Sequence, residues 1–210
     1  MIDILDFHTH HPEATAALIS VDPRQFAPQP GKWYSVGIHP WDTGEDIPAT
    51  DLQSLERCAR HPQVLAIGET GLDKLRGGDI EVQTTLFVRH LQLAHSVGKP
   101  VVIHSVRATQ QVLQCRQDAG LTSVPLAIHG MRAGERMARI WLDAGCYLSF
   151  GPRFNSSALL ITPLDRLLIE TDDDAITIQE VAALVAQALG LSTQAVITTA
   201  AENARRLLTK

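Results

Sequence analysis

The first residues in the sequence that could carry chemistry are a cluster of histidines near its start. The segment MIDILDFHTHH closes an apolar run with His8, His10 and His11, and Asp6 stands just ahead of them. Histidine is favoured neither in strands nor in turns, so fold construction does not explain the cluster. Residues two apart on a strand project from the same face. This spacing therefore predicts a metal site at a strand end, with further ligands supplied by other parts of the chain.

Other residues of this kind follow short apolar runs, which we predict to be strands buried on both faces. The runs are residues 4–8, 17–21, 34–39, 64–69, 100–104, 125–129, 146–150 and 167–172. Beyond the first pair of histidines, their ends carry His39, Glu69, His104, His129, Glu170 and Asp172. Equivalent positions on so many runs favour a shared metal site. The remaining histidines are interpreted as structural, namely His11, His61, His90 and His95.

Segments of helical periodicity separate most of these runs, and two more follow the last one. They are residues 50–61, 81–98, 107–120, 134–145, 177–190 and 198–208. The alternation predicts a single domain over residues 1–210 with an α/β fold, a TIM-type (β/α) barrel of parallel strands with outer helices. The barrel should be trimmed, because the first connection has room for only about one helical turn and the second, DPRQFAPQPGKW, is too rich in proline. A doubly wound open sheet is the alternative, but no glycine-rich phosphate loop follows the first strand.

Composition narrows the class of protein. The chain has 210 residues and a net charge of −5, with no basic run, which argues against coating nucleic acid by charge alone. Its three cysteines are isolated, as expected for reduced thiols. We see neither a signal peptide nor an apolar run long enough to cross a bilayer. We therefore expect a cytoplasmic protein without membrane association, and no obligate protein partner is evident.

The types of candidate ligand constrain the metal. Imidazoles and carboxylates without thiolates suit Zn²⁺, Mn²⁺ or similar cations. Four histidines and at least two carboxylates are more than one tetrahedral ion needs. Two divalent ions (Zn, Mn or Mg), bridged by a carboxylate and a water, would use the whole set.

The motifs resemble those of the TatD-like metal-dependent hydrolases, the TatD-type DNases of the amidohydrolase superfamily. The segments that carry the resemblance, in family order, are DFHTHH, VGIHP, AIGETGLD, PVVIHS, AIHG, DRLLIETD and AENARRLL. The resemblance implies one ion on His8, His10, Glu69 and Asp172, and a second on Glu69, His104 and His129. Glu69 would then bridge the ions, since no lysine stands at a strand end to take that role in modified form.

The sequence also departs from the family pattern. It is shorter than typical members, Arg107 stands one residue later than the usual arginine, and DDDA replaces the Ser/Ala-Pro that commonly follows the E-T-D motif. The last two departures lie where substrate would bind, so they bear on the substrate more than on the chemistry.

The expected function is divalent-metal-dependent hydrolysis of phosphodiester bonds, as in an exonuclease-like deoxyribonuclease, with DNA or a small phosphodiester as substrate. A metal-bridging hydroxide would attack phosphorus, with Glu69 and Asp172 as catalytic residues and Asp172 as proton acceptor. His39 is expected to bind a substrate oxygen. Three arginines, each three residues past a strand end, are predicted to bind phosphate. They are Arg107, Arg132 and Arg153.

Two other functions stay open: hydrolysis of a small-molecule ester, amide or lactone at the same dinuclear site, and a metal-binding scaffold without enzymatic activity. Trp33, Trp41 and Phe154 could stack on bases, although packing is the commoner use of each, and Trp41 is the best candidate. Glu170 is expected to serve either the metal site or the barrel interior.

Overall fold

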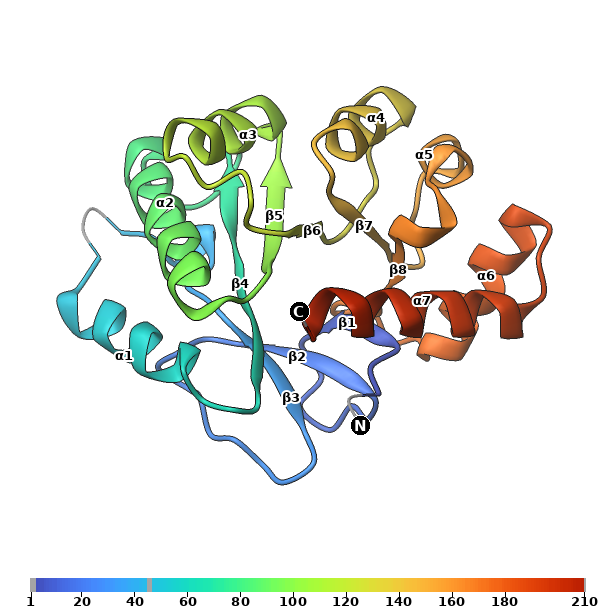
Figure 1. The fold of residues 1–210 in the computed structure, drawn as a ribbon, viewed down its shortest axis with the longest axis horizontal. Coiled ribbons are helices and arrows are strands. Elements are labelled where there is room, and N and C mark those ends of the chain that lie inside the picture. Colours follow the sequence, from blue (N-terminus) through green and yellow to red (C-terminus); the bar gives the residue numbers. More distant parts are fainter. Residues whose placement is uncertain (1–2, 45–46, 210) are drawn as a thin grey trace. The chain divides into compact units, whose positions relative to one another are not determined.

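The computed structural model describes residues 3–44 and 47–209, and its fold is a parallel β-barrel with helices between the strands (Figure 1). In these residues eight strands follow one another in chain order, and β8 pairs with β1. The strands are β1 (Asp6–Thr9), β2 (Ala17–Val21), β3 (Trp33–Val36), β4 (Val64–Asp73), β5 (Val101–Val106), β6 (Leu126–Ile128), β7 (Tyr147–Phe150) and β8 (Leu167–Ile169). The predicted TIM-type fold is confirmed, and the open-sheet alternative is wrong.

The helices of the described residues occupy the connections from β3 onward. They are α1 (Ala49–Ala59), α2 (Ile80–Val97), α3 (Thr109–Asp118), α4 (Glu135–Asp143), α5 (Ser156–Ile161), α6 (Ile178–Leu189) and α7 (Thr193–Leu208), with the 3-10 helices η1 (Pro40–Asp42) and η2 (Leu164–Arg166). The chain between β1 and β2, and between β2 and β3, contains no helix among the residues described. The predicted trimming of the barrel is therefore confirmed.

Several boundaries differ from the prediction. β3 ends at Val36 because the chain turns into η1, where Pro40 occupies the first helical position and His39 is the N-cap. β4 continues to Asp73, four residues beyond Glu69. The prediction missed α5, a helix of six residues that is too short to show helical periodicity.

The last two helices are separated by a sharp bend. Gly190 ends α6 in the left-handed conformation (φ 67°), and the Ser192 side chain caps α7, which begins five residues before the predicted start. No single helix in the described part of the chain is long and apolar enough to cross a membrane. Only α6 and α7 taken together pass that test of length and composition, and they are bent by 109°.

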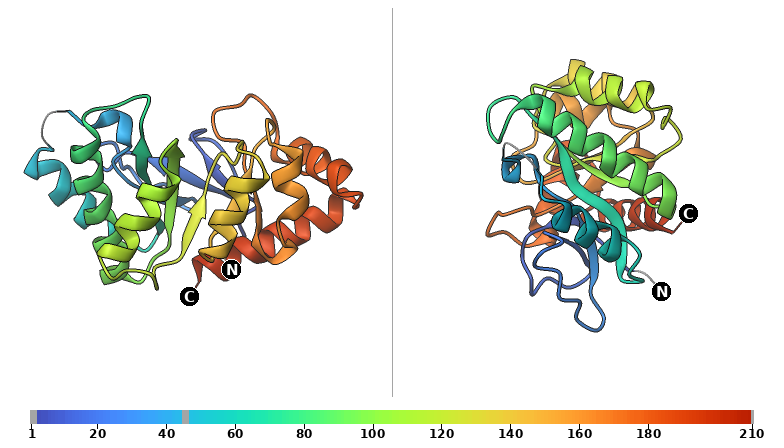
Figure 2. Two further views of the ribbon diagram at one scale, coloured as in Figure 1. Left: turned by 90° about the horizontal axis from the view of Figure 1, so that it is seen from above. Right: turned by 90° about the vertical axis from the view of Figure 1, so that its left-hand side faces the viewer.

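The chain divides into two compact units. The terminal unit comprises residues 1–19 and 127–210, and the central unit comprises residues 20–126. The predicted single-domain organisation stays a prediction. Figure 2 shows the same ribbon from two further directions, with the central unit in blue to green.

In the terminal unit, β1 pairs with β2 and β8, while β7 pairs with β6 and β8. α7 packs against β8, and the buried Asn203 side chain donates hydrogen bonds to the carbonyl groups of Leu164 and Leu167. These bonds secure the start of β8. The segment that follows this strand carries Glu170 and Asp172.

In the central unit, β4 pairs with β3 and β5, and α2 packs on β4. The buried His90 of α2 accepts the backbone N–H of Ile38 at Nε2 (3.0 Å), so its Nδ1–H donates to the carbonyl of Leu86 (2.9 Å). Burial lowers the pKa of His90 to about 4. The structural interpretation of His90 is confirmed, and this side chain anchors the segment that leads to His39.

Candidate metal centre

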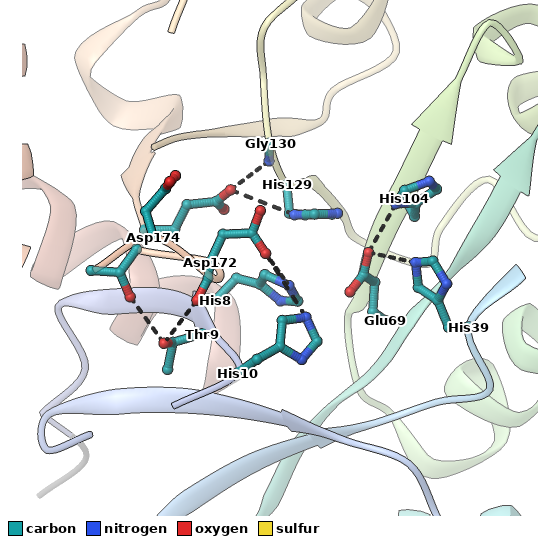
Figure 3. Close-up of polar contacts among 12 residues, drawn as sticks. His8, Thr9, His10, His39, Glu69, His104, His129, Gly130, Asp172 and Asp174 are labelled. Carbon is teal, nitrogen blue, oxygen red and sulfur yellow. Dashed lines mark hydrogen bonds and ion pairs between the residues drawn. The ribbon is translucent and has the colours of Figure 1, made fainter. Parts of the chain in front are cut away.

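In the terminal unit, two histidines of the first motif meet an aspartate from the segment after β8. The Nε2 atoms of His8 and His10 each lie 3.8 Å from Oδ1 of Asp172 (Figure 3). The His8 side chain is fully buried, whereas that of His10 is 39% exposed. The structure therefore brings together the three residues of this unit that were predicted to bind the first ion.

The backbone of Asp172 is held by hydrogen bonds to the end of β1. Its N–H donates to the carbonyl of His8 (3.0 Å), and its carbonyl accepts the N–H of His10 (3.2 Å) and the hydroxyl of Thr9 (3.3 Å). Asp172 has a φ of 55°, a left-handed conformation that costs a non-glycine residue about 1–2 kcal/mol. The bonds to β1 hold the residue in this conformation, which points its carboxylate at the two histidines.

Asp6, just ahead of the histidines, also binds the segment that carries Asp172. Its carboxylate accepts both the backbone N–H (3.0 Å) and the hydroxyl (2.6 Å) of Thr171. Burial raises the pKa of Asp6 to about 6. The first D of DFHTHH and the T of ETD are therefore partners, a pairing that joins the two ends of the sequence and that the predicted site lacked.

His129 lies beside His8, with ring centroids 4.3 Å apart, and its Nδ1 is 3.5 Å from Oε1 of Glu170. The same oxygen accepts the N–H of Gly130 (2.6 Å). Burial raises the pKa of Glu170, but hydrogen bonds and charge from His129 and its neighbours outweigh burial, and the pKa lies below its ordinary value. An ionised Glu170 facing Nδ1 helps to orient the His129 ring. Glu170 thus lies beside the histidines, and which of its two expected roles it serves stays a prediction.

The central unit holds a second cluster, formed by His39, Glu69 and His104. Oε1 of Glu69 lies 3.0 Å from Nε2 of His39 and 2.9 Å from Nδ1 of His104 (Figure 3). The Glu69 carboxylate is almost fully buried, and it comes from β4, while His104 comes from the neighbouring β5. The structure thus brings together the two predicted ligands of this unit, with His39 beside them.

The hydrogen bonds of His39 fix the position of its proton. Its Nδ1 accepts the backbone N–H of Trp41 (3.1 Å) as the N-cap of η1. The neutral ring therefore carries its proton on Nε2 and donates it to Glu69. In this state neither nitrogen has a lone pair left for a cation, which favours the prediction that His39 is not a ligand.

His104 is oriented by Asp73, a residue that the predicted site did not include. Oδ2 of Asp73 lies 3.0 Å from Nε2 of His104 and accepts the indole N–H of Trp41 (2.6 Å). Burial raises the pKa of Asp73, but the hydrogen bonds from Trp41 and His104 lower it by more than burial raises it. The carboxyl group is therefore ionised at neutral pH. Both nitrogens of His104 therefore face a carboxylate, Nε2 that of Asp73 and Nδ1 that of Glu69. Asp73 is the last residue of AIGETGLD. It follows Glu69 by four residues and so lies on the same face of β4, and this spacing could have identified it from the sequence.

The three predicted phosphate-binding arginines lie in different surroundings. Arg132 is 3.6 Å from Oδ2 of Asp172, and Arg153 is 2.8 Å from Oδ2 of Asp174, both with half-exposed side chains. Arg107 is exposed and follows β5 with a φ of 53°. Their role in binding phosphate stays a prediction.

Several of these groups have the composition and spacing of a divalent metal site. Among the described residues, potential ligand atoms from a single unit lie within 4.8 Å of one another in three sets: His8, His10 and Asp172; His129, Glu170 and Asp172; and His39, Glu69 and His104. Imidazole and carboxylate together suit Zn²⁺ or Mn²⁺. The clusters can therefore hold metal, as the donor types in the sequence predicted.

Comparison with known proteins agrees with this arrangement. The model of the TatD related DNase family matches residues 24–209. The chain belongs to this family. The resemblance seen in the motifs is thereby confirmed.

Curated TatD relatives align with only part of their own length. The uncharacterized metal-dependent hydrolase YcfH of Escherichia coli is 31% identical over 147 residues, 66% of this chain and 54% of that protein. The 3'-5' ssDNA/RNA exonuclease TatD of Cronobacter turicensis is 36% identical over 154 residues, 68% of this chain and 57% of that protein. The chain therefore spans just over half the length of these relatives.

Solved structures of TatD proteins share the fold. The TatD homolog YJJV of Escherichia coli superposes with a TM-score of 0.81 at 22% identity, over 100% of both chains. A TatD family hydrolase of Entamoeba histolytica gives 0.72 at 18% identity, over 84% of this chain and 74% of that one. At these identities the likeness concerns the barrel fold.

Proposed function

We propose that this TatD family member is a divalent-metal-dependent hydrolase of phosphodiester bonds that acts as a deoxyribonuclease. The observation that carries the proposal is a repeated arrangement, in which each unit places a carboxylate beside a ring nitrogen of a histidine. Asp73 orients His104, and Glu170 orients His129. Carboxylates behind ligand histidines are typical of metal sites. The family supports the reaction class, and a relative named as an exonuclease supports nucleic acid as substrate.

The proposed metal ligands are the six predicted from the sequence: His8, His10, Glu69, His104, His129 and Asp172. They would hold two divalent ions (Zn, Mn or Mg), with Glu69 shared between them. Such ions, when bound, acidify water to near-neutral pH and neutralise charge on phosphate oxygens.

The proposed work of the chain itself is to move a proton and hold the phosphate. Asp172 accepts the proton of the attacking water as a new P–O bond forms and the ester bond breaks. Arg132, close to the other oxygen of Asp172, binds a phosphate oxygen together with Arg107 and Arg153. His39 directs its Nε2–H to a substrate oxygen in place of Glu69.

The direct test is hydrolysis of end-labelled single-stranded DNA with added Mn²⁺, Mg²⁺ or Zn²⁺, before and after chelation, alongside metal analysis of the purified protein. Metal-dependent release of nucleotides that chelation abolishes is the expected result. Activity that survives full removal of metal would contradict the proposal, and so would full activity in Glu69→Gln.

A second candidate is hydrolysis of a small-molecule ester, amide or lactone at the same residues. It is favoured by the net charge of −5 and by the pairing of Arg132 and Arg153 with aspartates, which leaves less positive charge for a polyanion. A panel of fluorogenic diesters and lactones, run beside the DNA assay, separates the two. Metal binding without turnover of any substrate would favour the non-enzymatic scaffold.

A further inference from the structure

Trp41 is a large aromatic side chain that is exposed beside the cluster of the central unit. Its residue is 44% exposed. Its ring centroid lies 4.7 Å from that of His39 and 5.5 Å from that of His104. An indole in this position would contact a group attached to a phosphate that binds a cation held by Glu69 and His104.

The indole is held in one orientation. Its N–H donates to Asp73, and the loop that follows Asp73 is fixed by the buried side chain of Gln83. The amide of Gln83 accepts the N–H of Asp73 and donates to the carbonyl groups of Asp73, Arg76 and Gly78. A preformed aromatic surface loses little conformational entropy when a ligand stacks on it.

The loop that contains Trp41 and the loop that contains Arg76 are in direct contact. The N–H of Gly78 donates to the hydroxyl of Thr43 (3.0 Å), which in turn donates to the carbonyl of Pro40 (2.6 Å). Gly77 has a φ of 90°, and a Cβ there would lie 2.2 Å from the carbonyl oxygen of Pro40. Only glycine allows the two loops to approach this closely.

Arg76 lies across the face of this indole, with its Cζ 3.9 Å from the ring centroid. Within residues 3–44 and 47–209, no carboxylate forms an ion pair with Arg76 or with its neighbour Lys74. Both residues also line a cleft of about 390 Å³ with Leu75 and Gln111. A guanidinium held by an aromatic ring, with no carboxylate partner among the described residues, keeps its N–H groups available for a phosphate.

We propose that Trp41 and Arg76 form a nucleotide-binding subsite. The base next to the cleaved phosphate stacks on Trp41, and the guanidinium of Arg76 moves to the flanking phosphate. The inference rests on the proposed phosphodiesterase function and deepens it, because the subsite selects single-stranded nucleic acid over small esters. Unpaired bases expose their faces for stacking, whereas duplex bases do not.

The test measures binding to metal-free protein, by fluorescence anisotropy of labelled single-stranded hexanucleotides. One abasic site is moved through the hexamer, and the ratio of Kd values between abasic and intact DNA reports the stacked base. With the unchanged protein we expect a ratio of about tenfold or more at one position. Trp41→Leu should abolish this dependence, whereas Trp41→Phe, which stacks but cannot donate to Asp73, should retain most of it.

Two further variants separate stacking from charge and from general damage. Trp33→Leu makes the same chemical change at the start of β3, the end of that strand away from His39, so despite the earlier expectation for Trp33 it should leave the ratio unchanged. Arg76→Gln should weaken intact and abasic DNA alike and lower the slope of log K against log salt by about 0.7. Circular dichroism and thermal unfolding of each variant check that it folds.

Equal binding of intact and abasic DNA by the unchanged protein would overturn the proposal, as would absence of binding to both. A ratio that Trp41→Leu leaves intact would do the same. If the ratio behaves as expected but no metal restores hydrolysis, the subsite stands and the proposed function falls. If DNA is hydrolysed without any dependence on the base at Trp41, the function stands and the subsite falls.

Discussion

The two units place their candidate ligands by different means. In the terminal unit, backbone hydrogen bonds between β1 and the segment after β8 set Asp172 against His8 and His10. In the central unit, side chains hold one another, from Trp41 through Asp73 to His104. The first arrangement depends on the register of two strands, whereas the second depends on a chain of polar contacts. Apart from Asp6 and Thr9, whose side chains also bind this segment, the first should therefore tolerate changes among neighbouring side chains better than the second.

The surroundings of the clusters differ in charge as well. Arg132 and Arg153 of the terminal unit form ion pairs with aspartates, while the side chains of Lys74 and Arg76 in the central unit form no ion pair within the described chain. Among these residues, the central unit offers the positive charge that is free to meet a phosphate.

The largest effect is expected from a substitution in the cluster of the terminal unit. Asp172→Asn removes a proposed ligand and proton acceptor while keeping the size of the side chain, so kcat on DNA should fall by about 10²–10⁴-fold. Metal content, measured by mass spectrometry, should fall with it. Asp173→Asn is the matched control on the next residue. A variant at Asp172 that retains its metal and most of its rate would exclude this residue from both roles.

The next effect concerns the stability of the central unit. Burial lowers the pKa of His90 to about 4, so the folded state takes up a proton on this side chain at a lower pH than the unfolded state does. The contribution of neutral His90 to the free energy of unfolding should be fully present above pH 6.5. It should fall by ~3 kcal/mol as the pH drops from 6.5 to 4. Urea unfolding across this range measures the loss.

His90→Gln can keep an acceptor for Ile38 but cannot be protonated, and it should flatten this part of the pH profile. His95→Gln, an exposed position on the same helix, should leave the profile as it is. An unchanged slope in His90→Gln would assign the acid sensitivity to other groups.

A smaller effect tests the polar chain of the central unit. Asp73→Asn keeps the shape but removes the charge that orients His104, and metal affinity should weaken by about 10–100-fold. Isothermal titration with Zn²⁺ or Mn²⁺ measures it. Asp79→Asn, at the N-cap of α2, makes the same chemical change and should preserve affinity. Equal affinity in Asp73→Asn and the unchanged protein would show that His104 needs no partner.

The smallest effect compares the arginines of the two units. Arg107→Ala should raise KM for a phosphodiester several-fold, by loss of one charge-assisted hydrogen bond. Arg153→Ala should raise it less, because Arg153 must first leave Asp174. Neither variant should lose metal. Identical KM values in both variants and the unchanged protein would remove the predicted phosphate role.

The sequence predicted the fold, which is confirmed, and the candidate ligands, which stay a prediction, because both depend on short local patterns. Apolar runs ending in polar residues located most of the strand ends well enough to predict a barrel, and an H-x-H pair needs only the alternation of a strand. β3 was drawn three residues too long, because VGIHP looks apolar while Pro40 already starts η1. Cytoplasmic location, lack of membrane association and lack of an obligate partner stay predictions.

Contacts between loops could not be predicted from local sequence patterns. The partners of Trp41, namely Asp73 and Arg76, are more than thirty positions away, and nothing in their spacing predicts the meeting. The same holds for Asp6 and Thr171, which lie 165 positions apart. Such pairings depend on the side-chain conformations of two loops at once, and one sequence shows neither.

The amide of Gln83 has a consequence for anyone who would re-engineer the specificity of this protein. A transplanted loop in place of residues 73–78 would have to present one N–H and three carbonyl groups at the same points, or leave an amide stranded in the interior. The incoming segment would also need a glycine facing Pro40. Exchange of residues 39–44 and 73–78 as a single cassette, with Gln83 kept, is therefore the unit in which this region can be varied.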